Sequence, residues 1–444
     1  MQPNILFVFP DQHRPDYLGF DPSNPVRTPH IDALAARGIA FRNAISPSPL
    51  CSPCRACLAT GRAYPAVGVR DNGQSVPDGE VLLYHRLQAA GYHTMGCGKF
   101  DLHKPKHDWG LDGRNHLEAF GLSDGMDSEG KLDGAWAAVE RPCGPFTQML
   151  EERGLREIYV KDLLARTGDG YLRDDPCPLP DDAYGDNWVG GIAEDLLRRA
   201  PRGKPWFLQV NFPGPHDPWD ITESMKALYD SVEFPAPVAA AETDPERLRR
   251  LNGVRQNYAA MVTNIDRWLG RLLEAVAARG ELDNTLVVYA SDHGEMLGDH
   301  DRFAKTVPYR QSAGVPLVIA GPGVAARTAE QGPMALLDLS ATFLDLAGAD
   351  IPAAWDSASL RPYLADADAA PPRKVVTSGL DKASGDWRLT FDGRHKYVTG
   401  FEGQDELLWD VVADPSETEN LLETRPGEAA AILRELRSQN STDV

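Results

Sequence analysis

The chain has no long hydrophobic run. No apolar stretch approaches the roughly 18 residues that a helix needs to cross a bilayer, and the opening segment, residues 1–10, holds an apolar run only from Ile5 to Phe9. That run is also shorter than the hydrophobic region of a secretory signal peptide. We therefore expect neither membrane insertion nor export, and predict a cytoplasmic protein.

Positive charge is scarce. Lys and Arg number 45 against 65 Asp and Glu, so the net charge is −20. Proteins whose main task is to bind DNA, RNA or an anionic membrane need clustered lysines and arginines to meet the phosphates. The composition therefore argues against nucleic acids and membranes as partners. An anionic substrate would be small or oligomeric, and would need a local pocket of cations.

Cysteine is also scarce, with six in 444 residues, and three of these crowd into Cys51, Cys54 and Cys57. Such crowding does not suit a disulfide framework, and it fits a reducing compartment. A C-x-x-C-x-x-C run could ligate an iron–sulfur cluster or zinc, but the ferredoxin spacing needs a fourth cysteine where Gly61 stands. A thioredoxin-like pair lacks its βαβ context. Buried structural cysteines are a simpler alternative.

Strand-like runs alternate with helical patterns along most of the chain. Asn4–Phe9 is β-branched and aromatic without polar alternation, which is typical of a strand buried on both faces of a parallel sheet. The alternation predicts an α/β fold with a mostly parallel sheet. Further strands are expected at His93–Met95, Pro205–Val210, Thr285–Ala290 and Val315–Ala320, and helices at Thr28–Gly38, Arg55–Thr60, Leu82–Ala89 and Asn257–Ala278.

Polar groups follow three of these predicted strands: Asp11, the loop Asn211–Trp219, and Ser291–His293. Open α/β sheets bind ligands beyond the carboxyl ends of their strands. Asp11 and Asp292 are therefore expected at one edge of the sheet, although they lie far apart in the sequence. Either could by itself be an ordinary turn or cap residue.

The composition changes along the chain. Residues 1–365 are predicted to form the main domain, with a Gly-, Asp- and Arg-rich insertion or lid at 121–201 that shows weak periodicity. Residues 366–444 are predicted to form a small α+β subdomain with antiparallel strands at Lys374–Ser378, Trp387–Phe391 and Lys396–Val398, an Asp392-Gly393 turn, and a helix at Gly427–Ser438.

The sharpest local feature is the segment Cys51–Arg62, CSPCRACLATGR. It resembles the C-x-P-x-R motif, followed by L-x-T-G-R, of the type I sulfatases, in which a maturation enzyme oxidises the cysteine to formylglycine. Cys54 stands where most family members have Ser, which is a departure from the family pattern. Other family-like segments follow in family order over essentially the whole chain: Asn4–Gln12, Gly91–Thr94, Gly98–Lys99, Gly214–Pro218, Ser291–His300, Lys305 and Leu408–Asn420.

The resemblance implies a fold and a chemistry. The fold would be an alkaline-phosphatase-like sandwich: a large, mostly parallel sheet flanked by helices, then a small antiparallel C-terminal subdomain. A formylglycine derived from Cys51, in its hydrated form, would attack sulfur with one oxygen and release sulfate with the other. One divalent cation is expected, calcium first and manganese or magnesium as alternatives. Its ligands would be Asp11, Gln12, Cys51, Asp292 and His293.

The resemblance also implies roles for several cations and histidines. Arg55, one helical turn beyond Cys51, would hold the nucleophile and the metal-side carboxylates. Lys99 and Lys305 would contact the sulfate, and His216 would protonate the leaving alkoxide. Relatives carry a histidine two residues after the lysine that corresponds to Lys99. Asp101 takes that place here, so either His103 or Asp101 is the base that deprotonates the second hydroxyl.

Other features leave alternatives open. Asn72 would line the substrate pocket or be a plain turn residue, and Trp109, Trp136, Trp188 and Trp219 would stack on a ring or anchor loops. The predicted function is hydrolysis of a sulfate monoester of a sugar, choline or an aryl alcohol. The alternatives are phosphonate monoester or phosphodiester hydrolysis, which shares an Asp-Gln opening like Asp11-Gln12, and non-catalytic binding of sulfated glycans. A formylglycine-generating enzyme is the expected partner, and a homo-oligomer remains open.

Overall fold

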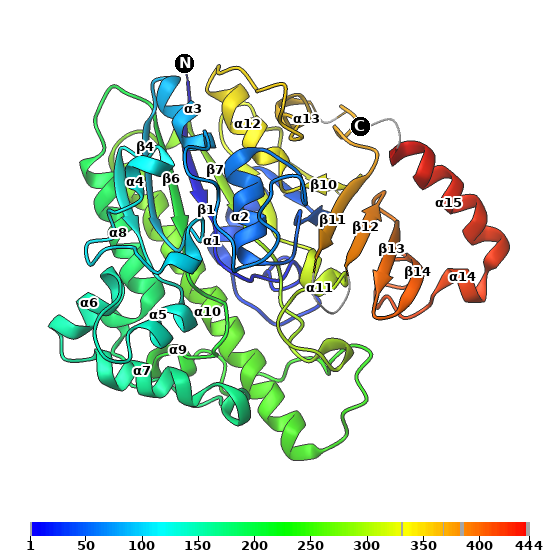
Figure 1. Cartoon of the computed structure of the whole chain (residues 1–444), viewed down its shortest axis with the longest axis horizontal. Helices are drawn as coiled ribbons and strands as arrows, with labels where there is room; N and C mark the ends of the chain where they lie inside the picture. Colours follow the sequence, from blue (N-terminus) through cyan, green and yellow to red (C-terminus); the bar gives the residue numbers. More distant parts are fainter. Residues whose placement is uncertain (1, 330–331, 367, 382–385, 441–444) are drawn as a thin grey trace.

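The computed structural model describes residues 2–329, 332–366, 368–381 and 386–440. Figure 1 shows a large sheet flanked by helices and, beside it, a small sheet with the last two helices. No helix in these ranges is long and apolar enough to cross a membrane.

The large sheet has eight strands in the part of the chain that the structure describes, in the order β5-β4-β6-β1-β7-β8-β2-β9. Strand β8 runs antiparallel to its two neighbours, and the other pairs are parallel. The predicted mostly parallel sheet is confirmed. The strands are β1 (Asn4–Val8), β2 (Ile39–Phe41), β4 (His93–Gly98), β5 (Asp124–Asp127), β6 (Trp206–Asn211), β7 (Thr285–Ala290), β8 (Leu317–Ala320) and β9 (Arg327–Ala329).

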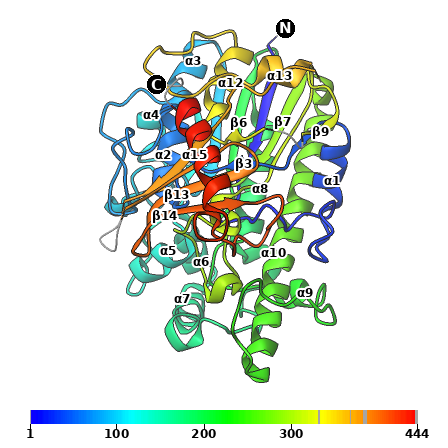
Figure 2. The same ribbon diagram turned by 90° about the vertical axis from the view of Figure 1, so that its right-hand side faces the viewer.

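Helices cover both faces of this sheet because alternate side chains of its buried strands point to opposite sides. Ile5 and Phe7 join one apolar cluster, under α2 (Cys51–Thr60), α3 (Leu83–Ala89) and α12 (Asp338–Leu346). Leu6 and Val8 join another, under α1 (Pro29–Ala36), α8 (Gly185–Arg199) and α10 (Pro245–Ala278). Figure 2 shows α1 and α10 on one side of the strands and α2 on the other.

The helix predicted at Asn257–Ala278 begins earlier, at Pro245, where the Asp244 side chain accepts a hydrogen bond from the Glu246 N–H at 2.9 Å. Its first turns are exposed and polar, so they carry no apolar periodicity. Strand β4 likewise runs on to Gly98, three residues beyond its predicted end. A Cβ at Gly98 would lie 2.0 Å from the Asn211 carbonyl oxygen, and its φ is +89°, so glycine is required there.

Residues 121–201 were predicted to be an insertion or lid, and the structure corrects this in part. Strand β5 pairs with β4 in the main sheet, and α8 packs on that sheet. Between them, α5 (Lys131–Ala137), α6 (Pro145–Glu152) and α7 (Arg156–Ala165) share an apolar cluster with α9 (Glu223–Lys226) and part of α10. These helices lie beyond the carboxyl ends of the strands, at the lower left of Figure 1.

The small sheet is antiparallel, as predicted, in the order β11-β12-β13-β14. Its strands are β11 (Val376–Leu380), β12 (Trp387–Phe391), β13 (His395–Phe401) and β14 (Gln404–Asp410), followed by α14 (Leu421–Thr424) and α15 (Pro426–Asn440). The Asp392 carboxylate accepts from the N–H groups of Arg394 and His395 and so closes the predicted turn. Strand β14 was not predicted as a strand.

The small sheet packs against segments that lead into the large one. One apolar cluster joins Trp387 and Leu389 to Leu50, Met296 and Val307. The Trp387 indole N–H donates to the Thr306 carbonyl at 3.1 Å, so the small sheet holds the segment that carries Lys305. The remaining short elements are β3 (Ala44–Ile45), β10 (Met334–Ala335), α4 (Leu117–Phe120), α11 (Arg310–Ala313) and α13 (Arg361–Ala365).

Candidate active site

Three chain segments meet at the carboxyl edge of the large sheet. Strands β1 and β7 are parallel neighbours, so the residues that follow them, Asp11 and Asp292, lie side by side as predicted. The backbone N–H of Gln12 donates to the Asp292 carboxylate at 3.0 Å and ties the two strand ends together. The third segment is the N-terminus of α2.

Helix α2 places Cys51 at its first residue, which confirms the predicted position near a helix N-terminus. Leu50 is extended, and the helix ends at Gly61 with φ 66°. Pro53 lies in the first turn, where a missing N–H costs nothing. The Asn72 side-chain carbonyl accepts from the Ser52 N–H at 3.0 Å, so a residue from another loop caps the helix.

Four buried groups converge where a metal could bind. One ligand atom from each of Asp11, Cys51, Asp292 and His293 lies within 4.8 Å of the other three. The Cys51 Sγ is 3.3 Å from His293 Nε2 and 3.9 Å from Asp11 Oδ1. This sulfur stands where an oxygen of a hydrated formylglycine would lie.

The donor set fits a divalent cation. His293 Nδ1 is 3.0 Å from the Gly294 carbonyl oxygen, so Nδ1 carries the proton and the Nε2 lone pair faces the other three groups. The carboxylates of Asp11 and Asp292 are fully buried, and a cation would offset their charge.

The side chain of Gln12 is hydrogen-bonded to residues outside these four groups. Its amide nitrogen donates to Asp217 at 3.1 Å and to Glu295, and its carbonyl oxygen accepts from Lys305. The prediction of Gln12 as a metal ligand therefore stays a prediction. Its amide links the segment after β1 to the loops that carry Asp217 and Lys305, a role that no local sequence pattern predicts.

Arg55 is 3% exposed and lies between the two carboxylates. Its Nε donates to Asp292 at 2.9 Å, and its guanidinium is 3.6 Å from Asp11. The Arg55 Nη1 donates to the Lys99 carbonyl at 2.6 Å. The spacing of four residues from Cys51 on one helix makes this position possible, as predicted.

Lys99 follows β4 and is 3% exposed. Its ammonium contacts Asp11 and lies 3.1 Å from the Asp101 carboxylate. Burial lowers the pKa of Lys99, but Asp101 and Asp11 raise it well above its usual range. Lys99 is therefore a permanent cation at the site.

These charges decide the ionisation of the neighbouring groups. Burial and Asp11 raise the pKa of the Cys51 thiol, but Lys305, Lys99 and His293 together lower it well below its usual range. Burial and Asp292 raise the pKa of Cys54, whose side chain belongs to the apolar cluster under α2. Cys51 is therefore the reactive cysteine of the pair, and Cys54 a buried inert one.

A second group of residues flanks Cys51 on the side of the loop after β6. Lys305 Nζ is 2.6 Å from His216 Nε2 and also contacts the Gln12 carbonyl oxygen. His216 Nδ1 lies 2.5 Å from the Asp217 carbonyl oxygen, which fixes the ring. The structure thus brings Lys305 and His216 together as predicted.

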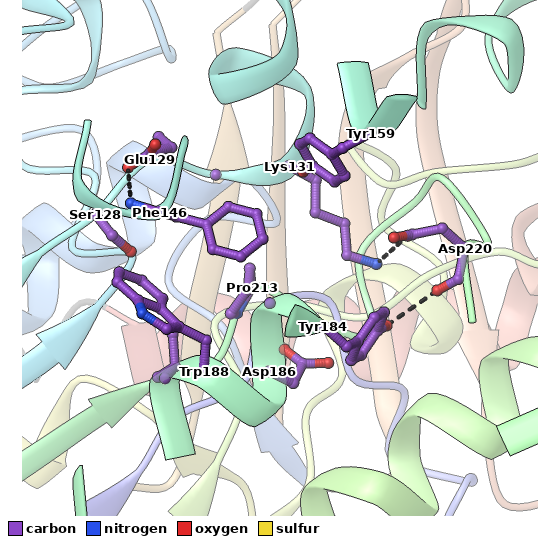
Figure 3. A pocket seen from close by; sticks show the side chains of 13 residues that line it. Ser128, Glu129, Lys131, Phe146, Tyr159, Tyr184, Asp186, Trp188, Pro213 and Asp220 are labelled. Atoms are coloured by element: carbon purple, nitrogen blue, oxygen red, sulfur yellow. Dashed lines mark hydrogen bonds and ion pairs between the residues drawn. The ribbon is translucent and has the colours of Figure 1, made fainter. Parts of the chain in front are cut away.

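Lys131, on α5, was missed by the sequence analysis. Its ammonium donates to the His216 carbonyl at 2.8 Å, to the Pro218 carbonyl at 3.2 Å and to the Asp220 carboxylate at 2.8 Å. Figure 3 shows the Lys131 side chain pointing to Asp220. It thereby ties α5 to the loop that carries His216. A single lysine in a segment of weak periodicity gives no signal of this role.

The structure does not bring His103 to the site. Its ring stacks on His116 and Phe120, with ring centroids 4.8 and 5.5 Å away, and none of its described contacts is with Cys51 or Lys99. Asp101, the alternative that the sequence left open, lies beside Lys99 and 3.2 Å from Lys104. The prediction that His103 is the base stays a prediction, and the contacts of the two side chains favour Asp101 for that role.

A pocket opens from these groups to the surface. It is lined by Asn72, Gly73, Lys99, Lys104, Pro105, His107, Lys131, Leu132, Asp133, Trp136, Pro213 and His216. Of the four tryptophans singled out in the sequence, Trp136 lines this pocket. Trp109 and Trp219 are buried, and Trp188 lines the neighbouring pocket of Figure 3, which shares Lys131 and Pro213 with this one.

Two family models match this chain, and together they cover nearly all of it. The family model described as Sulfatase matches residues 3–349, and the one described as N-sulphoglucosamine sulphohydrolase, C-terminal, matches residues 298–442. An arylsulfatase from Clostridium perfringens (strain 13 / Type A) is 28% identical over 456 residues, which cover 95% of this chain and 90% of that protein.

Two solved structures share the fold. A phosphonate monoester hydrolase of Agrobacterium radiobacter has a TM-score of 0.81 at 24% identity, covering 100% of this chain and 96% of that chain. A protein solved with its substrate D-glucosamine-2-N,6-O-disulfate has a TM-score of 0.78 at 20% identity, covering 100% of this chain and 98% of that chain. Because the sulfatase model matches most of the chain, this protein belongs to the sulfatase family of the alkaline phosphatase superfamily and is an enzyme that hydrolyses sulfate esters.

Proposed function

We propose that this sulfatase works with a formylglycine made from Cys51 and with one divalent cation held by residue 51, Asp11, Asp292 and His293. The observation that carries the proposal is the convergence of these four buried groups within 4.8 Å, flanked by Arg55 and Lys99. The formylglycine would supply a diol with one oxygen to attack sulfur and another to release sulfate. The cation would acidify that diol and offset the sulfate charge.

The ion we propose is calcium, with manganese or magnesium as alternatives. Two carboxylates and a diol oxygen are hard ligands that suit calcium. The imidazole of His293 is a softer ligand and favours manganese more than it favours calcium. Metal analysis of the purified protein, followed by reloading with each ion, would identify the ion that supports activity.

The remaining groups would each have a separate role in binding the sulfate or in the reaction. We assign Arg55 to holding the two carboxylates and residue 51 in place, because it is buried between them. Lys99 and Lys305 would bind sulfate oxygens as fixed cations. His216, whose Nδ1 is held by the Asp217 carbonyl, would in its protonated form give the Nε2 proton to the leaving alkoxide, and Lys305 lies next to it to stabilise that oxygen.

Asp101, rather than His103, would be the base for the second hydroxyl of the diol. It is 4% exposed and lies 3.1 Å from the Lys99 ammonium, which borders Cys51 in the site. Asn72 contributes by capping α2 and lining the pocket mouth.

Phosphonate monoester and phosphodiester hydrolysis is a second candidate. It is favoured by the Asp11-Gln12 opening and by the likeness in fold to the phosphonate monoester hydrolase. Rates on p-nitrophenyl sulfate and on p-nitrophenyl phenylphosphonate, measured side by side on one metal-loaded preparation, separate the two. A higher kcat/KM on the sulfate is the expected result, and a preference for the phosphonate would replace the proposal.

The maturation of Cys51 is tested by mass spectrometry. Conversion to the aldehyde removes about 18 Da from the peptide that contains residue 51. Protein from its own cells is expected to show this loss, which requires a formylglycine-generating partner that accepts Cys54 in place of Ser. An unmodified thiol, together with no hydrolysis and retained sulfate binding, would favour the non-catalytic glycan binder instead.

The six cysteines are unpaired, and five of them are buried. This supports the proposal that the protein works in a reducing compartment, the cytoplasm. Small or oligomeric sulfated molecules remain the proposed substrates, because the net charge is −20 while Lys99, Lys104 and Lys131 line one pocket.

A further inference from the structure

The pocket continues outward past the groups assigned to the sulfate. Beyond Lys99 and His216 its lining includes Asn72, Lys104 and His107, together with Asp133 and Trp136 of α5. The first five residues of α5 hold both Lys131, which ties the His216 loop, and Asp133. The outer wall is therefore fixed relative to the sulfate site.

Trp136 is unusual among the large apolar side chains. It is 56% exposed and lines the pocket, although Ala135, its neighbour on the same helix, is fully buried. An indole left in water at a pocket mouth offers a flat apolar face for a ring.

The lining near Trp136 also holds hydrogen-bond donors and acceptors. The Asp133 carboxylate accepts from Lys104 at 2.8 Å, and Lys104 is shared with Asp101 at 3.2 Å, so both outer groups are held in place while still reaching the pocket. The Asn72 side chain lines the same pocket. Its carbonyl oxygen accepts from the Ser52 N–H, so its amide N–H₂ is not used in that hydrogen bond. The ring of His107 is stacked on Trp109, with centroids 5.4 Å apart.

This combination discriminates between the substrate classes. A hydroxyl group both donates and accepts, so a sugar can satisfy an acid, an ammonium and an amide together. An aryl ring would desolvate Asp133 and Lys104 without replacing their hydrogen bonds with water. A quaternary ammonium group has no N–H and no lone pair, so it would leave the Lys104 ammonium and the Asn72 amide without hydrogen bonds.

We propose that the alcohol part of the substrate is a sugar ring, stacked on Trp136 and hydrogen-bonded by Asp133, and that these two side chains determine specificity for it. The inference rests on the proposed function, since the sulfate must bind at Lys99 and His216 for the ring to reach this wall. Asp133 would accept a hydrogen bond from a ring hydroxyl next to the sulfate ester.

The test compares kcat/KM of the matured, metal-loaded enzyme on three classes of sulfate. The sugar class is glucose 6-sulfate, N-acetylglucosamine 6-sulfate, glucose 3-sulfate and galactose 4-sulfate, and the others are p-nitrophenyl sulfate and choline sulfate. We expect kcat/KM on the best sugar sulfate to exceed kcat/KM on p-nitrophenyl sulfate and on choline sulfate. Asp133→Asn should lower kcat/KM on that sugar at least about ten-fold and on p-nitrophenyl sulfate less than about three-fold. Trp136→Ala should raise KM for the sugar sulfate.

Val139→Ala is the matched control, because Val139 is an equally exposed apolar residue just after α5 that does not line the pocket. It should leave both activities unchanged. A wild-type preference for the aryl or choline ester overturns the inference, as does an equal loss on sugar and aryl sulfates in Asp133→Asn. If p-nitrophenyl sulfate and every other sulfate resist a formylglycine-containing, metal-loaded enzyme, the proposed function fails and this inference fails with it.

Discussion

At the scale of single residues, the site depends on buried charges that compensate one another. Burial raises the pKa of Asp11, but Lys99, His216 and Arg55 lower it well below its usual range. For His293, burial lowers the pKa, and Asp292 and Cys51 raise it. Each of these groups would be expensive to bury alone, and the arrangement is stable only as a set.

The base that serves the second hydroxyl is open to a direct test. Asp101→Asn keeps the shape of the side chain but removes its charge, and we expect kcat to fall about 10²- to 10⁴-fold, the usual contribution of a positioned base. His103→Ala should change kcat less than about three-fold, because that ring stacks outside the site. Steady-state kinetics on p-nitrophenyl sulfate measures both. A larger loss in His103→Ala than in Asp101→Asn would restore His103 as the base.

His13 gives a prediction about stability and pH. It is fully buried, its Nε2 is 2.9 Å from the Tyr17 carbonyl oxygen, and its Nδ1 is 2.8 Å from the Tyr289 hydroxyl, so the neutral ring satisfies both partners. Burial lowers the pKa of His13 from 6.5 to about 4. The unfolded chain therefore binds a proton at higher pH than the folded one, and stability falls as the pH drops below 6.5 towards 4.

Between about pH 7.5 and about pH 5 this difference removes about 2 kcal/mol from the free energy of unfolding. His13→Gln lacks the titrating ring. Over the same pH interval its free energy of unfolding should therefore fall by about 2 kcal/mol less than that of the wild type. Urea unfolding of both proteins at the two pH values measures it. An identical pH dependence in the variant and the wild type would contradict the prediction.

At the scale of elements, the contacts between α5 and the loop after β6 position the proposed general acid. Lys131 is buried and donates to two carbonyls of that loop and to Asp220. In Figure 3 its ammonium lies next to Asp220, at the side of the pocket that Tyr184 also lines. A helix that carries part of the outer wall thus also fixes the loop with His216.

Lys131→Met should therefore have two separable effects. Stability should fall by about 3–5 kcal/mol because Asp220 is left buried without its cation, and kcat should fall about ten-fold because His216 is no longer held. Adding Asp220→Asn removes the unpaired charge and should restore much of the stability without restoring kcat. Chemical unfolding and steady-state kinetics on both variants separate the effects. Full recovery of kcat in the double variant would show that Lys131 acts only on stability.

At the scale of the whole molecule, the two strand ends, α2 and the small sheet are brought together at one place. The small sheet holds the Lys305 segment through Trp387, and β1 and β7 supply the two carboxylates. A metal bound to this meeting point should stabilise the entire fold, because the unfolded chain cannot assemble the ligands.

We expect chelation with EDTA to lower the melting temperature by several degrees, and readdition of the proper ion to restore it. Binding at 1,000 times the dissociation constant contributes about 4 kcal/mol. Asp292→Asn, which removes a proposed ligand, should melt at the same temperature with and without the ion. Differential scanning calorimetry measures the transition. A wild-type protein that contains the ion but melts unchanged after its removal would contradict the proposed site.

The sequence alone determined the alternation of strands and helices, the mostly parallel direction of the strands in the large sheet and the motif around Cys51. Those features depend on local patterns: buried runs such as Asn4–Val8, the four-residue spacing of Cys51 and Arg55, and polar residues directly after strands. Even the pairing of Asp11 with Asp292 could be expected, because parallel strands end at one edge.

Tertiary structure alone decided which of the nearby polar residues face the site. His103 stacks on His116, Gln12 is hydrogen-bonded to Asp217 and Lys305, and Lys131 reaches the His216 loop from a segment with weak periodicity. Each of these outcomes depends on a contact between residues distant in the sequence or on a single positive φ, as at Asp101. Local patterns carry no information about such contacts, since the partner's position is set only when the layers pack.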